Sequence, residues 1–384
     1  MSTTAAQGFV AAGVTAGIKA SGRPDLALVV NTGPDKVCAA VYTSNRFQAA
    51  PVLWSKGVTA SGVLDAVVLN SGGANACTGA DGLADSKATA QLVASAIGTT
   101  PDRVAVCSTG LIGVRLPMDA ITRGVSIAAE TLDAQGGSDA AQAIMTTDTV
   151  PKTAVESVDG WTVGGMAKGA GMLAPALATM LVVITTDAVL TAAEADAALR
   201  EATRLTFDRT DSDGCMSTND TVILMASGAS GVRPSTEAFT EALTAVCGDL
   251  ASQLLADAEG AAHDIAIHVE KAATEDDALD VARCIARSNL FKCAVFGNDP
   301  NWGRVLAAAG TSKATFDPDA VSVSFNGVEV FTSGGLGADR SLVDLKSSRD
   351  VDVTVDLAAG DAYATVWTND LTYDYVKENA EYSS

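Results

Sequence analysis

A small-residue loop that leads directly into an apolar run is the feature that most constrains this chain of 384 residues. The loop runs from Lys168 through Gly-Ala-Gly-Met-Leu-Ala-Pro-Ala-Leu to Ala178, and Thr179 and the run Met-Leu-Val-Val-Ile follow it. A hydroxyl between a flexible loop and a buried strand is typical of proteins that cut themselves and use the new N-terminal residue as nucleophile. We therefore interpret the Ala178–Thr179 bond as a cleavage site and Thr179 as the nucleophile.

Cleavage at this bond gives Thr179 an α-amine that can serve as its own general base. The hydroxyl attacks the carbonyl carbon of Ala178, an acyl shift from nitrogen to oxygen forms an ester, and hydrolysis frees the threonine. An α-amine has a reference pKa of about 7.7–8.0, so much of it is neutral near neutral pH. The alternative is a plain buried strand after a loop, and the pattern alone does not separate the two. A membrane span is disfavoured because Lys168, Pro175 and Asp187 interrupt or bound the apolar stretch.

The scarcity of histidine supports a catalyst that does not depend on an imidazole. The chain has only His263 and His268, and neither lies beside a Ser or Cys nucleophile motif. We expect neither a metal ion nor an organic cofactor. The formal net charge of -21 repels phosphate backbones and anionic membranes, so we expect no nucleic-acid or membrane partner. Seven scattered cysteines and the absence of a signal-like N-terminus indicate a reduced, cytoplasmic protein.

Strands and helices alternate along the whole chain, which predicts an α/β protein. The expected strands cover residues 26–30, 39–42, 65–69, 103–107, 180–185, 222–225 and 263–269, and the expected helices cover 81–97, 191–204, 237–258 and 276–288. Thr191 and Glu194 form a capping box, and Gly260 is expected to cap the end of the helix over 237–258. Alternating apolar residues over 322–367 predict a strand-rich segment. We expect a core domain over about 1–235 and a smaller α+β region over about 236–384.

The triplet Ser108-Thr109-Gly110 follows an expected strand and is a candidate oxyanion site. A glycine lets the backbone approach a ligand closely. A hydroxyl and an N–H group there can bind a developing negative charge, and each such donor is worth about 10²–10³ in rate. The alternative is a simple turn from strand to helix.

Three further polar positions are informative only in combination. Thr146, Thr147 and Asp148 belong to a polar knot that can bind a carboxylate or cap a helix. Lys168 can lower the pKa of the Thr179 α-amine or hold a substrate carboxylate, and a solvated lysine is the alternative. Glu259 follows the expected helix over 237–258, and most glutamates in such positions face solvent.

Together these motifs resemble the ornithine acetyltransferase family, whose members are bifunctional glutamate N-acetyltransferases and amino-acid acetyltransferases of arginine biosynthesis. The resemblance spans essentially the whole chain. It rests on Cys107–Gly113, Ala143–Thr149, Lys168–Met172, Leu177–Leu181, Ser217–Thr221, Asp257–Gly260, Asp299–Arg304, Tyr375–Asn379 and Ser384. Ala174 and Ala176 depart from the polar residues that family members often carry beside the loop proline, which bears on the rate of self-cleavage.

The resemblance implies a layered αββα-like fold of the kind shared with certain aminopeptidases, and a smaller C-terminal α+β domain. It implies an α chain over 1–178 and a β chain over 179–384 that associate, as α2β2 or larger. Carried over by motif, Thr179 is the nucleophile, and Thr109 and Gly110 form the oxyanion hole. The positions that match substrate contacts are Thr146, Lys168, Thr179, Glu259, Asn379 and Ser384, with Thr147 as the alternative to Thr146.

The implied reaction moves an acetyl group from N2-acetylornithine to glutamate through an acetyl-Thr179 ester, without a cofactor. The resemblance also implies that acetyl-CoA serves as an acetyl donor. Three alternatives stay open at this point. They are an amidohydrolase or aminopeptidase that uses the same N-terminal threonine, an acetyltransferase paralogue of secondary metabolism, and a non-catalytic binding protein of similar fold.

Overall fold

The computed structural model describes residues 2–172 and 180–381 of the chain. Its strands are β1 (Phe9–Val14), β2 (Leu26–Asn31), β3 (Val37–Tyr42), β4 (Ala66–Ser71), β5 (Val104–Thr109), β6 (Lys152–Val158), β7 (Trp161–Lys168), β8 (Leu181–Thr186), β9 (Thr221–Ala226), β10 (Asp264–Ala272), β11 (Ser322–Phe325), β12 (Val328–Thr332), β13 (Gly335–Leu336), β14 (Asp350–Asp356) and β15 (Ala362–Asn369). Its helices are α1 (Ala50–Thr59), α2 (Gly79–Ile97), α3 (Met118–Glu130), α4 (Gly137–Ala143), α5 (Ala192–Leu205), α6 (Thr236–Ala256), α7 (Glu275–Ala286), α8 (Asn289–Phe296), α9 (Trp302–Ala309) and α10 (Tyr373–Glu381). Each predicted strand and helix has its counterpart here. Strands β1, β6 and β7 and helices α1, α4, α8, α9 and α10 were not predicted.

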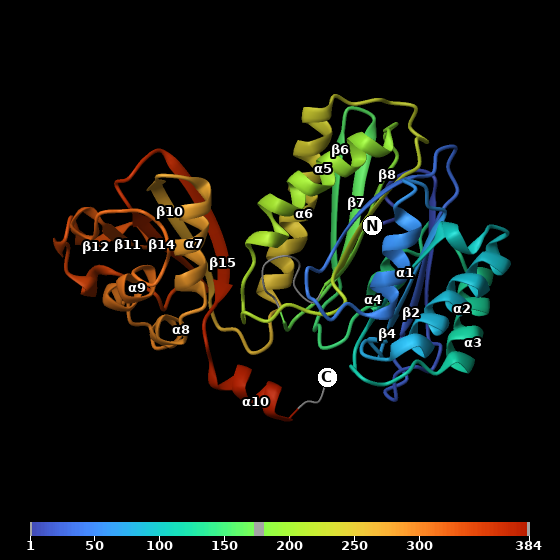
Figure 1. Ribbon diagram of the computed structural model, residues 1–384, viewed down its shortest axis with the longest axis horizontal. Coiled ribbons are helices and arrows are strands. Elements are labelled where there is room, and N and C mark those ends of the chain that lie inside the picture. Colours follow the sequence, from blue (N-terminus) through green and yellow to red (C-terminus); the bar gives the residue numbers. More distant parts are fainter. Residues whose placement is uncertain (1, 173–179, 382–384) are drawn as a thin grey trace.

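Two sheets stack face to face and form the larger body on the right of Figure 1. The first sheet has the order β1-β2-β4-β5, and the second has the order β3-β9-β8-β7-β6. Helices α2 and α3 cover the outer face of the first sheet, and α5 and α6 cover the outer face of the second. The predicted αββα layering is therefore confirmed.

The core on both sides of β8 follows from the two-residue period of a strand. Leu181 and Val183 point into the layer between the two sheets, whereas Val182 and Ile184 point toward α5 and α6. All four side chains are buried. This placement explains why an uninterrupted apolar run follows Thr179 in the sequence.

Strands from both sides of the Ala178–Thr179 bond are interleaved in the second sheet. β3, β6 and β7 precede this bond in the chain, and β8 and β9 follow it. β7 pairs antiparallel with β8, so that Lys168 opposes Leu181, and β3 pairs antiparallel with β9. Two hydrogen-bonded ladders therefore join the segment before the bond to the segment after it.

A six-stranded sheet of order β13-β12-β11-β14-β10-β15 forms the smaller body on the left of Figure 1. Helices α7, α8 and α9 pack on one face of this sheet, around buried residues such as Phe291, Phe325 and Val353. The domain boundary that we predicted near residue 235 falls before α6. The change in packing comes after α6, because Leu243 and Leu250 of this helix pack in the core of the larger body.

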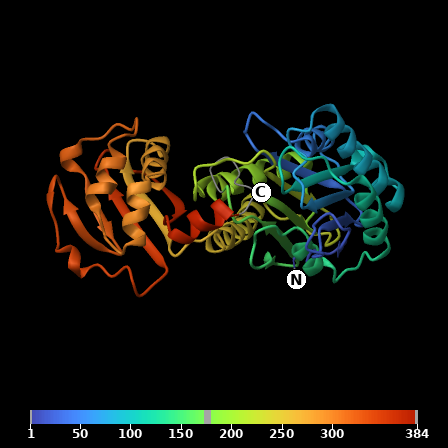
Figure 2. The same ribbon diagram turned by 90° about the horizontal axis from the view of Figure 1, so that it is seen from below.

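The caps of two helices test the sequence reading. Thr191 and Glu194 form the predicted capping box at the start of α5. The prediction that Gly260 caps α6 is wrong, because α6 ends at Ala256 and Asp257 occupies the cap. Gly260 has a φ of +62°, and a Cβ there would lie 2.2 Å from the Tyr375 nitrogen. This glycine therefore makes room for the start of α10, which lies between the two bodies (Figure 2).

A helix that crosses a bilayer needs about 20 predominantly apolar residues. None of the helices within 2–172 and 180–381 meets that requirement.

Candidate active site

Two strand ends from different sheets meet at the predicted oxyanion site. β5 ends at Thr109 and β7 ends at Lys168, and both side chains are buried. The Lys168 ammonium donates a hydrogen bond to the Thr109 hydroxyl, with Nζ 3.3 Å from Oγ1. Because an ammonium cannot accept a hydrogen bond, the hydroxyl accepts here and its own proton is left for another acceptor. The structure thus brings together two residues that the sequence singled out separately.

The backbone after Thr109 makes a turn that only glycine fits. Gly110 has a φ of +128°, and a Cβ at this position would lie 2.6 Å from the Gly73 nitrogen. The amides of Gly72 and Gly73 donate to the Thr109 carbonyl at 2.9 and 3.0 Å. Both the backbone angle and the lack of space therefore require glycine at 110. We call this closely packed backbone of residues 72–73 and 109–110, which lies beside the Thr109 hydroxyl, the oxyanion ledge.

Asp148 is buried and accepts hydrogen bonds from three segments around this site. Its donors are the Lys152 ammonium at 2.6 Å, the Gly169 amide at 2.7 Å and the Thr146 amide at 2.9 Å. Burial alone would raise the pKa of this carboxyl, but the charges of Lys168 and Lys152 and these hydrogen bonds lower it to about 2. Asp148 is therefore ionised at neutral pH and holds the Thr146 turn against the end of β7.

The charge of Lys168 is held in a buried environment. Burial lowers the pKa of its ammonium, and the nearby carboxylates of Asp148 and Asp220 oppose that shift. Lys152, which also lies nearby, lowers it further. An ammonium in such a place gains stability from any additional anion, so this end of β7 favours a ligand with a negative charge.

The buried pairs of Lys152 lead to a stability prediction. Its Nζ lies 2.6 Å from Asp148 and 2.6 Å from Asp257, and the lysine itself is fully buried. Lys152→Met leaves Asp148 buried without its closest cation, so we expect the free energy of unfolding to fall by about 3–5 kcal/mol at pH 7. Urea unfolding measures the change. Lys271→Met is the matched control, because that lysine pairs with Asp356 on the surface and should cost less than about 1 kcal/mol.

The lowered pKa of Asp148 also sets the sign of an acid effect on the same variants. The wild-type carboxyl contributes stability above its unfolded pKa of about 3.9, and that contribution is lost as the pH falls from about 4 toward 2. In Lys152→Met the native carboxyl loses a cation that lowers its pKa, so its pKa moves up toward or past the unfolded value, and the loss of stability on acidification becomes smaller than in the wild type. A wild-type urea midpoint that is constant from pH 5 to pH 2 would contradict the assigned charge.

Glu259 lies beside the residues that directly follow β7. A Cβ on Gly171 would come within 2.6 Å of the Glu259 carboxylate, and the Glu259 amide donates to the Ala170 carbonyl at 2.9 Å. Thr147 and Glu259 line one cavity of about 420 Å³. The Thr146 hydroxyl instead lies 3.5 Å from Asp148. Which of the two threonines touches a substrate stays a prediction.

The C-terminal helix reaches the same cavity. Glu378 and Glu381 of α10 help to line it together with Glu259. Asn379, on the same helix, is exposed and donates from Nδ2 to the Tyr375 carbonyl at 3.0 Å. The structure thus places the predicted contact Asn379 on an element beside Glu259, although no described contact joins the two side chains.

Three predicted site positions, Ala178, Thr179 and Ser384, lie outside the described residues. Met172 and Met180, the described residues on either side of the loop, are held by two carboxylates of the segment over 213–220. These carboxylates were not among the predicted site residues. Asp213 accepts from the Met172 amide at 2.7 Å, and Asp220 accepts from the Met180 amide at 3.1 Å. Burial raises the pKa of Asp220 well above its usual range. Two signals were available for Asp220, its position just before an expected strand and its place in the Ser217–Thr221 motif of the resemblance.

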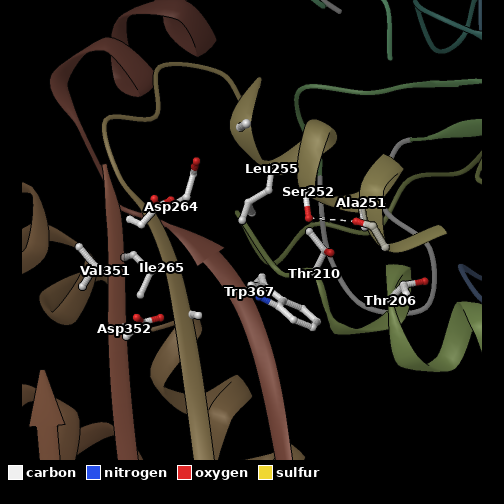
Figure 3. A pocket seen from close by; sticks show the side chains of 14 residues that line it. Thr206, Thr210, Ala251, Ser252, Leu255, Asp264, Ile265, Val351, Asp352 and Trp367 are labelled. Carbon is white, nitrogen blue, oxygen red and sulfur yellow. Dashed lines mark hydrogen bonds between the residues drawn. The ribbon is translucent and has the colours of Figure 1, made fainter. Parts of the chain in front are cut away.

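A larger cavity, of about 700 Å³, lies away from these residues (Figure 3). It opens between the end of α6 and the sheet of the smaller body, where Leu255 and Ser252 face Trp367 and Asp352. None of the predicted catalytic or substrate-binding side chains that the structure describes lines it. The buried polar groups converge at Thr109 and Lys168 instead, so the predicted oxyanion site remains the candidate. Across the described ranges, no group of three or more His, Cys, Asp or Glu side chains is arranged to hold a metal ion.

Comparisons with known proteins agree with one another. The model of the ArgJ family matches residues 10–384. The arginine biosynthesis bifunctional protein ArgJ of Streptomyces coelicolor is 65% identical over 384 residues, which cover 100% of both chains. A solved chain of the arginine biosynthesis bifunctional protein ArgJ from Bacillus halodurans is 35% identical, with a TM-score of 0.50, and covers 52% of this chain and 98% of its own. A chain of ornithine acetyltransferase from Mycobacterium tuberculosis, solved with ornithine, is 56% identical with a TM-score of 0.45. The match covers 47% of this chain and 96% of that chain.

Proposed function

Since this chain belongs to the ArgJ family, we propose that it moves an acetyl group from N2-acetylornithine to glutamate through an ester on Thr179. Family membership makes it a bifunctional enzyme of arginine biosynthesis. The observation that carries the mechanism is the buried hydrogen bond from Lys168 to Thr109. Leu181 opposes Lys168 in the sheet, so the chain shortly after Thr179 runs beside this hydrogen bond.

Self-cleavage before Thr179 precedes the transfer reaction in this proposal. Strands β7 and β8, which flank the loop, are neighbours in the second sheet, so the loop begins and ends at the end of that sheet where Lys168 meets Thr109 of the first sheet. The solved Bacillus halodurans chain also supports a cut. The match covers nearly all of that chain but only about half of this one, as expected for one of two cleavage products. We expect an α chain over 1–178 and a β chain over 179–384.

In the first half-reaction, the Thr179 hydroxyl attacks the acetyl carbonyl carbon of N2-acetylornithine. Its proton passes to the Thr179 α-amine, and the carbonyl oxygen becomes an oxyanion. The Thr109 hydroxyl and the Gly110 amide donate to this oxyanion, and Lys168 keeps the hydroxyl proton free for it. The carbon–nitrogen bond then breaks, the leaving amine takes the proton back from the α-ammonium, and ornithine departs from an acetyl-Thr179 ester.

In the second half-reaction, the neutral amine of glutamate attacks the ester carbonyl carbon. The same donors on Thr109 and Gly110 hold the second oxyanion. The bond from the carbonyl carbon to the Thr179 oxygen breaks, and a proton of the attacking amine returns to that oxygen through the α-amine. N-acetylglutamate leaves, and the enzyme is ready for another acetyl donor without any net change.

N2-acetylornithine and glutamate must occupy one pocket in turn. Some of the predicted contacts bind the α-carboxylate that both share, and others bind the side chain that differs between them. We assign the common α-carboxylate to Lys168, whose buried charge favours an anion. We assign the side-chain ammonium of ornithine to Glu259, which lines the neighbouring cavity. Thr146, Asn379 and Ser384 complete the proposed set of contacts.

We also propose that acetyl-CoA loads the same threonine. A thioester is a better acyl donor than an amide, and the oxyanion site serves both. The overall charge of -21 gives no general attraction to the phosphates of coenzyme A, so we expect this donor to be slower than N2-acetylornithine. No resident cofactor is included in either route. We further propose a cytoplasmic enzyme in which α and β chains stay associated, as α2β2 or larger.

One experiment separates transfer from hydrolysis by the same threonine. The purified protein is given N2-acetylornithine with and without glutamate, and ornithine release is followed over time. A transferase should release one equivalent of ornithine quickly and then continue only when glutamate is present. Steady release of ornithine and acetate without glutamate would instead establish the amidohydrolase alternative. Parallel double-reciprocal lines for the two substrates would independently support the ester intermediate.

A further inference from the structure

Lys19 is a partly buried lysine that the proposed mechanism does not use. It lies in the loop between β1 and β2, and its side chain is half-buried. Its Nζ donates to the Met145 carbonyl at 2.6 Å and to the Pro24 carbonyl at 3.0 Å. Met145 immediately precedes the Thr146 turn, so this ammonium sits directly on the turn that borders the proposed pocket.

The loop that carries Lys19 is held rigidly against the oxyanion ledge. The buried Asp25 carboxylate accepts four consecutive amides, from Ala16 to Lys19, at 2.6 to 3.1 Å. The Asp25 carbonyl accepts the Ser71 amide at 2.9 Å, and the next residue, Gly72, donates to Thr109. A Cβ on Gly72 would lie 3.1 Å from Cγ of Lys19. Lys19 therefore has a fixed place beside the turn after β4, which bonds the end of β5.

The positive charge of Lys19 is not neutralised by a contacting anion. Within the described part of the chain, no carboxylate lies within ion-pair distance of its Nζ, and both of its hydrogen bonds go to neutral carbonyls. Asp25 is already satisfied by its four amides, and Asp148 is paired with Lys152. Burial, together with the charges of Arg23 and Lys168, lowers the pKa of Lys19 to about 8, and the charges of Asp25 and Asp148 oppose that shift.

The turn that Lys19 contacts also reaches the predicted ornithine contact. Two residues beyond Met145, Thr147 lines the cavity that Glu259 lines. The short turn over 145–147 therefore has a cation, Lys19, bonded to its first residue, and an anion, Glu259, in the cavity that its last residue lines. The two substrates of the proposed reaction differ in their side chains in the corresponding way, because ornithine ends in an ammonium and glutamate ends in a carboxylate.

From this geometry we propose that Lys19 binds the side-chain carboxylate of glutamate and so selects the acetyl acceptor. The inference rests on the proposed function and deepens it. Lys19 has one N–H left after its two carbonyl bonds, and a carboxylate is the acceptor that an uncompensated ammonium prefers. N2-acetylornithine has no carboxylate at that position, so Lys19 contributes to the acceptor half-reaction and not to the donor half-reaction.

The test compares Lys19→Met with the wild type in the two half-reactions separately. The KM for glutamate should rise by about 10–100-fold in the variant, which is the usual range for the loss of a charge-assisted hydrogen bond. The rapid release of ornithine from N2-acetylornithine alone should stay within about twofold. The preference for glutamate over glutamine as acceptor should fall by a similar factor, because glutamine lacks the charge. Lys19→Arg should restore most of that preference.

Lys36→Met is the matched control for these measurements. Lys36 is also half-buried, also donates to a backbone carbonyl, that of Asn31, and also has a pKa lowered by burial, but it lies at the other end of the first sheet. An equal loss in both half-reactions of Lys19→Met, without a change in the glutamate-to-glutamine ratio, would reduce Lys19 to a structural support and overturn the proposal. So would unchanged kinetics. If the wild type itself releases no ornithine and accepts no glutamate, the proposed function fails instead.

Discussion

Thr179→Ala is expected to stay a single chain of 38.7 kDa and to lose acetyl transfer by more than about 10⁴-fold. The change removes the oxygen that forms the ester in self-cleavage and again in both half-reactions. The fold should persist, because the strands that flank the loop are buried in the second sheet. Gel electrophoresis and intact mass report cleavage, and the mass after incubation with N2-acetylornithine reports the acetyl group.

Thr179→Ser is the control for that variant, because it keeps a hydroxyl and an α-amine. It should cleave, though more slowly or less completely, and should gain the mass of one acetyl group from N2-acetylornithine. The proposed mechanism would be wrong if the wild type transfers acetyl groups while it remains one uncut chain. It would equally be wrong if Thr179→Ala still forms the acetyl-enzyme.

Thr109→Val should lower kcat for acetyl transfer by about 10²–10³-fold with little change in KM. Valine matches the shape of threonine but has no proton to donate to the oxyanion, so the effect falls on the transition state. Lys168 then loses the acceptor that it holds at 3.3 Å, although its charge remains. Self-cleavage passes through a similar tetrahedral oxyanion, so maturation of Thr109→Val should slow as well. The cleaved fraction is therefore measured first, and kcat is normalised to it.

Two further variants define what the Thr109→Val result means. Thr109→Ser keeps the donor and should recover most of the lost kcat. Thr131→Ala removes an exposed hydroxyl that bonds the carbonyls of Ile127 and Ala128 within its own helix end, and it should leave kcat unchanged. A kcat for Thr109→Val close to that of the wild type would show that the oxyanion lies elsewhere.

The elements that could be predicted from sequence are those with a local cause. β8 is a continuous apolar run because both of its faces are buried, and the capping box at Thr191 depends on two side chains three residues apart. Thr109 and Gly110 stood out because a hydroxyl and a glycine follow a strand. The family resemblance supplied the layered architecture, which no single segment specifies.

The features that could not be predicted depend on contacts between distant segments. Lys152 is fully buried between Asp148 and Asp257, yet a single lysine at the start of a strand usually faces water. Gly260 looked like the end of α6, whereas the space that it leaves is taken by Tyr375, more than a hundred residues later. Lys19 gave no signal at all, because its role depends on a carbonyl of the Met145 turn.

The interleaving of strands in the second sheet has a consequence for assembly if the chain is cut before Thr179, as we propose. Before the cut, β7 finds β8 through a short connection, and the whole sheet forms within one molecule. After the cut, the same ladder, and the ladder between β3 and β9, join two separate polypeptides. A mature molecule that unfolds loses the high effective concentration that the connection supplied, and its halves must meet again at their bulk concentration. In this proposal the covalent connection of the intact precursor keeps the two halves together while the sheet forms, and self-cleavage then removes that connection.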